Sequence, residues 1–115
     1  MSKIINLTKH AIHVVDEAGE LRCTIEPSGT VAKVHIDRFV DDEIMHEGIA
    51  FRLHRTRAGS VTDVPEPVVG IFYVVSRFIA LALKNEGRTH DIIVTDLLVR
   101  DDEGVIVGCR GFARV

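Results

Sequence analysis

The chain has 115 residues, of which 46% are hydrophobic and 27% charged, a balance typical of one globular domain spanning residues 1–115. The net charge of −3 excludes the broad positive field with which DNA-binding domains attract a polyanion. Because no apolar run reaches the roughly 18 residues of a membrane span and the start lacks a signal-peptide core, we expect a cytoplasmic protein that binds neither DNA nor membrane.

The N-terminal part predicts a short strand followed by a hairpin. Lys3 to Leu7 reads as the strand. Ile12 to Asp16 and Leu21 to Glu26 flank a turn in which Gly19 takes the positive φ, so they are expected to pair. Cys23 and Cys109 have no metal-ligand spacing, and in a reducing cytosol we expect both to be free and buried rather than joined in a disulfide.

The middle of the chain predicts another strand, a second hairpin and a loop. Apolar and polar residues mostly alternate from Val31 to Ile36, which indicates a strand with one solvent-exposed face. Glu43 to His46 and Ile49 to Arg55 flank Glu47-Gly48, a turn sequence. Arg57 to Pro67 carries Gly, Ser, Thr, Asp and two prolines, and is therefore expected to be a loop.

A strand-to-helix step follows. Ile71 to Val75 is β-branched and aromatic, which favours a strand, and the pattern then becomes helical over about residues 76–86. Ser76 is a credible N-cap, and Gly87 is well placed to end the helix.

A third hairpin closes the chain. Ile92 to Val99 and Val105 to Cys109 flank the acidic turn Arg100 to Gly104. Three hairpins and one principal helix predict an α+β fold with a mainly antiparallel β-sheet.

The sequence carries no recognisable catalytic motif and no metal-ligand spacing that would indicate an enzyme. It has no Gly-x-Ser-x-Gly, no phosphate-loop motif, and no cysteine matched to a histidine by a local signature. The six histidines are scattered, so a zinc site would have to assemble from distant positions. The acidic runs Asp41–Glu43 and Asp101–Glu103 sit at turns, where such residues are favoured for their own hydrogen bonding.

The predicted helix start carries the clearest binding pattern. The N–H groups after Ser76 favour an anion, and Arg77 places a cation in the same turn. Lys84 and Arg88 can follow on one helical face, with Phe78 as a nearby aromatic surface. Cations beside an aromatic ring suit a nucleotide, with phosphate on the cations and the base on the ring. The alternative is a solvated basic face over a core-packed Phe78.

Two further arginine groups could close a phosphate pocket. Arg52, Arg55 and Arg57 lead out of the second hairpin, and Arg100, Arg110 and Arg114 lie on the last hairpin and the tail. Either group could equally form exposed ion pairs, which are common and contribute little stability.

Four segments, in this order and spacing, resemble a known family. They are Ile5–His10, Pro27–Val34, Tyr73–Ser76 and Leu98–Arg114. Together they are similar to phage Thoeris anti-defence proteins, which act as sponges for cyclic ADP-ribose-type signals made by TIR-domain enzymes. The resemblance implies a small, β-rich homo-oligomer, from dimer to hexamer, that works in the cytoplasm of the infected bacterial host.

The resemblance also implies a ligand and contacts for it. The ligand would be a cyclic ADP-ribose isomer, with a cyclic oligonucleotide at a second site, and neither would be cleaved. Phe78 and Arg100 match the family's adenine contacts, and Arg57 is the basic candidate for the second site; Arg77 and Arg88 come from the helix pattern above. The family resemblance implies no cofactor, no metal and no catalytic residue.

Two other functions stay open on the sequence. One is a hydrolase acting on the same signal. The other is a phage protein–protein interaction module without a ligand.

Overall fold

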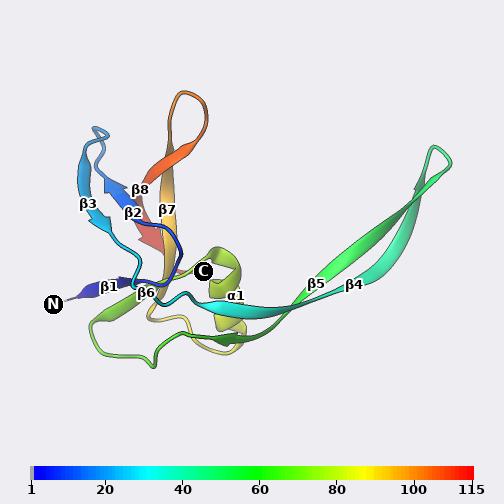
Figure 1. Ribbon diagram of the computed structural model, residues 1–115, viewed down its shortest axis with the longest axis horizontal. Coiled ribbons are helices and arrows are strands. Elements are labelled where there is room, and N and C mark those ends of the chain that lie inside the picture. The colour runs from blue at the N-terminus through cyan, green and yellow to red at the C-terminus, as the bar shows by residue number, and fades with distance from the viewer. Residues whose placement is uncertain (1) are drawn as a thin grey trace.

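A computed structural model describes residues 2–115 and has a mainly-β fold with one short helix in that range. A body of six strands and the helix holds one end of a long β-hairpin arm (Figure 1). The elements in chain order are β1 (Lys3–Asn6), β2 (Ile12–Val15), β3 (Leu21–Ile25), β4 (Lys33–His46), β5 (Ile49–Thr62), β6 (Ile71–Val74), α1 (Arg77–Asn85), β7 (Ile92–Arg100) and β8 (Ile106–Ala113).

The body is one strongly curled sheet with strand order β1-β6-β7-β8-β2-β3. Its two outer strands approach each other, because Asn6 at the end of β1 forms a bridge with Pro27, just after β3. The Ser28 amide also donates to the Asn6 carbonyl at 2.9 Å. The sheet is therefore close to a closed barrel.

The sheet is mixed, so the prediction of a mainly antiparallel sheet is wrong for the body. The pairs β2–β3 and β7–β8 are antiparallel hairpins, as expected, whereas β1–β6, β6–β7 and β2–β8 are parallel. Helix α1 fills the connection from β6 to β7, and such a crossover returns the chain in the same direction. Gly108 permits the close β2–β8 approach, since a Cβ there would lie 2.8 Å from the His13 carbonyl oxygen.

The helix begins and ends where its capping residues predict. The Ser76 hydroxyl accepts a hydrogen bond from the Ile79 amide at 3.3 Å. At the other end Gly87 has φ +87°, its amide donates to the Lys84 carbonyl, and the Arg88 amide donates to the Leu83 carbonyl. This pair of bonds is a Schellman motif, which only a residue tolerant of positive φ can close.

The core lies on both faces of the sheet. On one face Tyr73, Val75 and Ile92 pack with Ala80 and Leu83 of α1. On the other face, inside the curl, a smaller cluster gathers Ile12, Val74, Ile93 and Cys109. Alternate residues of β6 and of the start of β7, Ile92 to Val94, thus point to opposite faces and both faces are covered, which explains the apolar sequence of these two segments.

The second hairpin is much longer than its sequence predicts. The Glu47-Gly48 turn is confirmed, with both residues at positive φ, but each flanking strand has 14 residues. The strand expected at residues 31–36 is the start of β4, and residues 57–62, expected in a loop, continue β5 to Thr62. The Gly59-Ser60 sequence reads locally as a breaker, yet β5 continues through it with a β-bulge, because Ala58 and Val61 pair with Ile36 and Val34 and leave one extra residue on β5.

Both cysteines are free, but only Cys109 is buried, so the expectation of burial is wrong for Cys23. Cys23 on β3 and Cys109 on β8 both lie opposite Val14, so strand β2 stands between the two sulfur atoms. Burial raises the pKa of the Cys109 thiol, so this sulfur remains a packed, protonated group. Across residues 2–115, α1 is too short to qualify as a membrane-crossing helix.

Candidate functional site

A hollow lies where β1 and β6 end. The two strands are parallel, so their carboxyl ends share one edge of the sheet. From this edge β6 leads into α1, whereas β1 leads away to β2 on the other side (Figure 1). Adjacent parallel strands whose connections diverge leave a crevice between them, the usual place for a ligand in sheets of this kind.

Two neighbouring cavities open there and share part of their lining. The first has a volume of about 350 Å³ and the second about 310 Å³. Both are lined by His10, Ile12, Thr95 and Leu98, so they meet along one wall. Either volume lies in the range of small-molecule pockets, and the mostly apolar walls with a few polar groups are typical of such pockets.

The larger cavity reaches the start of α1. Its lining includes Thr8 from the loop after β1, and Ser76 and Arg77 from the helix start. No acidic residue occupies the first turn of α1, and none of the ion pairs within residues 2–115 includes Arg77. The guanidinium therefore adds its charge to the positive end of the helix dipole, and an anion in the cavity would meet both.

Asn6 holds the loop that forms the opposite wall, and the sequence reasoning missed it. The Asn6 side chain is buried, and its amide donates to the carbonyl oxygens of His10 at 2.8 Å and Ile25 at 3.1 Å. Its carbonyl oxygen accepts from the amide and the hydroxyl of Thr8 at 2.9 and 2.6 Å. The signal was present, because Asn two residues before Thr at a strand end is a pattern for such local turns.

Arg88, a predicted ligand contact, is bound to its own chain. Its guanidinium donates to both carboxylate oxygens of Asp91, at 3.1 and 2.8 Å, and to the Pro65 carbonyl at 2.7 Å. It also lies over the Tyr73 ring, 5.7 Å from the centroid. The Nε and Nη2 donors, which form the edge that would grip a phosphate in pairs, are used in these bonds, and the group fastens the loop after β5 to the body.

The Arg88 contact sets the charge of Asp91. Burial raises the pKa of this carboxyl, but the hydrogen bonds and charge of Arg88, with a smaller contribution from His90, outweigh burial and bring the pKa below its ordinary value of 3.8. The same hydrogen bonds raise the pKa of Arg88 against the opposing effect of its burial. Both groups are therefore ionised throughout the physiological range.

The other three predicted residues lie outside the two cavities. Phe78 follows Arg77 on α1 and is 41% exposed. Arg100 ends β7, where its guanidinium donates to the Gly104 carbonyl at 2.9 Å. Arg57 is on the arm, 5.5 Å from the centroid of the Phe39 ring. Within one copy, then, only Arg77 of the five predicted residues lines the hollow.

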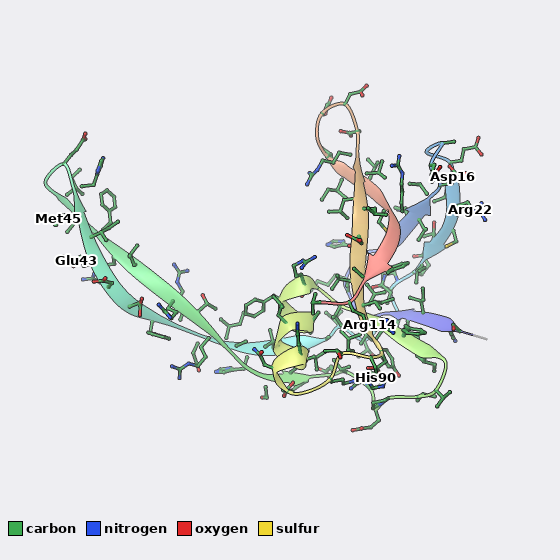
Figure 2. All side chains as sticks on the ribbon, turned by 180° about the vertical axis from the view of Figure 1, so that it is seen from behind. Asp16, Arg22, Glu43, Met45, His90 and Arg114 are labelled. Carbon is green, nitrogen blue, oxygen red and sulfur yellow. The ribbon has the colours of Figure 1, made fainter. Side chains whose placement is uncertain are left out.

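A third cavity, about 410 Å³, lies at the opposite end of β6, beside Gly70 and Ile71. Figure 2 shows His90 and Arg114 together here, and the Arg114 guanidinium donates twice to the His90 carbonyl, at 3.1 and 2.8 Å. Because its arginine is engaged in this way, this cavity is a weaker anion site than the hollow beside Arg77.

Residues 2–115 contain no group of three or more His, Cys, Asp or Glu side chains placed to hold a metal ion. No protein-family model matches the chain, and no curated protein or solved structure is significantly similar to it.

Proposed function

We propose that this protein binds and sequesters a cyclic ADP-ribose isomer without cleaving it, and so blocks a bacterial immune signal. The observation that carries the proposal is the hollow at the ends of β1 and β6, with Arg77 and the helix start on its wall. The resemblance of four segments to the Thoeris anti-defence family supplies the ligand class. A homo-oligomer in the host cytoplasm, with a cyclic oligonucleotide as a second ligand, belongs to the same proposal.

The hollow suits the two chemical halves of such a ligand. Phosphate would lie against Arg77 and the first amides of α1, which a helix leaves without partners inside itself. The apolar wall of Ile12, Val74 and Leu98 would take the face of a base or ribose. Phe78 and Arg100 remain contacts inferred from the resemblance, and would reach the same ligand from its rim or from another copy.

A protein that sequesters a signal must bind it tightly, so the binding site should shield the ligand from water. Nanomolar affinity requires about −12 kcal/mol. One exposed arginine–phosphate contact supplies only a small part of this, because water screens it. Several charge-assisted hydrogen bonds inside a partly enclosed cavity, together with a base on an apolar wall, can reach it.

The proposal predicts a selective effect of Arg77. Replacing Arg77 by Ala should weaken binding of a cyclic ADP-ribose isomer roughly 10- to 100-fold in isothermal titration calorimetry, because one charge-assisted contact is lost. Lys84 is the matched control, since it is an exposed cation on the same helix but outside the cavity lining. Lys84→Ala should change affinity by less than about twofold. Equal affinity of Arg77→Ala and the unchanged protein would refute this site.

A further inference from the structure

Leu97 has a backbone conformation that leucine rarely adopts. Its φ is +53°, in the left-handed region that suits glycine, although it lies inside β7 in the hairpin that rises from the body (Figure 1). The other two non-glycine residues with positive φ in residues 2–115 are Glu47 at a turn and Asp63 at a bend after β5. A bulky side chain in this region is strained, and such strain persists where the surrounding structure imposes it.

Before Leu97, the side chains of β7 alternate regularly between the two faces of the sheet. Ile92 and Val94 pack on the helix side, in the larger core cluster. Ile93 packs inside the curl, in the smaller cluster. If this alternation continued, Thr95 would lie inside the curl and Leu98 on the helix side.

Leu98 lies inside the curl instead. Its antiparallel partner on β8 is Cys109, a member of the cluster inside the curl, and directly paired residues project from the same face of a sheet. Thr95 is on this face too, since its partner Phe112 packs against the same cluster. The alternation therefore breaks between Thr95 and Leu98, and the left-handed residue between them is Leu97.

The break places two residues of β7 on one wall of the hollow. Thr95 and Leu98 both line the larger and the smaller cavity, where the two cavities share a wall. Leu97 is outside both linings and is 63% exposed, with its Cδ1 atom 3.9 Å from the point that a Cβ on Gly111 would occupy. Leu97 thus shapes the hollow through its backbone and not through its side chain.

We propose that Leu97 is a positioning residue, whose left-handed backbone turns Leu98 into the hollow and so builds the apolar wall that takes the base or ribose of the ligand. The assignment of a nucleotide to this wall rests on the proposed function. The placement of Leu98 does not, and it is testable without any ligand. An extended backbone at Leu97 would turn Leu98 to the helix side and remove it from the shared wall.

A matched pair of variants tests the backbone conformation. Leu97→Gly and Leu97→Ala lose nearly the same side-chain contacts, but only glycine adopts positive φ without strain. In urea denaturation, the folding equilibrium constant of Leu97→Gly should be about five- to tenfold higher than that of Leu97→Ala. At Val99, an extended position of the same strand, alanine should be more stable than glycine. A Leu97→Ala variant at least as stable as Leu97→Gly would overturn the proposal.

The thiol of Cys109 reports where Leu98 lies. Cys109 is 1% exposed, lines the smaller cavity and has Leu98 as its cross-strand neighbour. In a Cys23→Ser background, Leu97→Gly should leave the slow reaction of Cys109 with iodoacetamide unchanged. Leu97→Ile, whose β-branched side chain opposes positive φ, should speed it about tenfold while the circular dichroism spectrum stays the same.

Equal thiol reaction rates in the glycine and isoleucine variants would contradict the placement of Leu98 by Leu97. If Leu97→Ile does not fold, Leu97→Ala takes its place, because alanine also opposes positive φ.

Ligand binding separates this inference from the proposed function. In isothermal titration calorimetry, Leu97→Gly should bind a cyclic ADP-ribose isomer within about twofold of the unchanged protein, and Leu97→Ile about tenfold more weakly. Equal affinity of Leu97→Ile and the unchanged protein would overturn the positioning role. If the unchanged protein itself binds no such ligand, the proposed function fails, and the stability order and the thiol rates decide the placement of Leu98 alone.

Discussion

Replacing Arg88 by Met is expected to lower the free energy of unfolding by about 3–5 kcal/mol, which is a large share of the stability of a domain this size. The reason is Asp91, which is 3% exposed and receives two hydrogen bonds from the Arg88 guanidinium. Without the cation, the carboxylate stays buried with its main partner gone. Urea denaturation at pH 7, followed by circular dichroism, measures the change.

The double variant Arg88→Met with Asp91→Leu provides the control. Removing both charges abolishes the uncompensated carboxylate, so this variant should recover about half or more of the loss. A double variant that is less stable than Arg88→Met alone would show that lost packing, and not the buried charge, causes the effect.

The pH dependence follows from the same pair. The pKa of Asp91 is lower in the folded protein than in the unfolded chain, so its ionisation stabilises the fold. This stabilisation is present in full above the ordinary pKa of 3.8 and is lost as pH falls through the lower folded value. The unfolding free energies of the unchanged protein and Arg88→Met should therefore converge as pH falls below about 4.

Replacing Asn6 by Asp should destabilise the fold by about 3 kcal/mol or more at pH 7, despite the nearly identical shape. The change removes the amide that donates to His10 and Ile25 and places a negative oxygen beside their two carbonyl oxygens. Asn6 is only 1% exposed, so water cannot screen the repulsion between the carboxylate and these carbonyl oxygens. Denaturation in urea at pH 7 gives the loss of stability.

Asn85→Asp supplies the comparison, because Asn85 is exposed at the end of α1. The same chemical change there should cost less than about 1 kcal/mol. If Asn6→Asp proved no more harmful than Asn85→Asp, Asn6 would not hold the wall of the hollow as described. A folded Asn6→Asp protein should also bind ligand more weakly, since Thr8 and His10 line the cavity.

Local sequence signals located most of the elements. Ser76 and Gly87 mark the ends of α1 because capping depends on neighbouring backbone groups alone. The turns at Gly19, Gly48 and Gly104 have positive φ, so their hairpins were predictable in the same way. The parallel pairing of β2 with β8 was not predictable, because Val14 and its partner Cys109 are 95 residues apart and local patterning does not specify such a pair.

The candidate site was harder to predict than the fold. Arg77 was found because a basic residue beside an N-cap is a local pattern, and it lines the hollow. Arg88 was predicted to belong to the same basic face. The helix ends before it, however, and its guanidinium forms an ion pair with Asp91, three residues later. The contacts of Asn6 with Thr8 and His10 are local, but its bond to the Ile25 carbonyl depends on the end of β3, which meets Asn6 only in the folded chain.

A protein that sequesters its signal must retain the cyclic nucleotide intact, and the release of bound nucleotide tests this property most directly. The purified protein is incubated with cyclic ADP-ribose isomers made by a TIR enzyme, freed of unbound ligand, and heat-denatured, and the released nucleotide is identified by mass spectrometry. We predict intact cyclic ligand, near one equivalent per hollow. Release of a linear product would instead indicate a hydrolase, and an absence of retained nucleotide would contradict the proposed function and favour an interaction module.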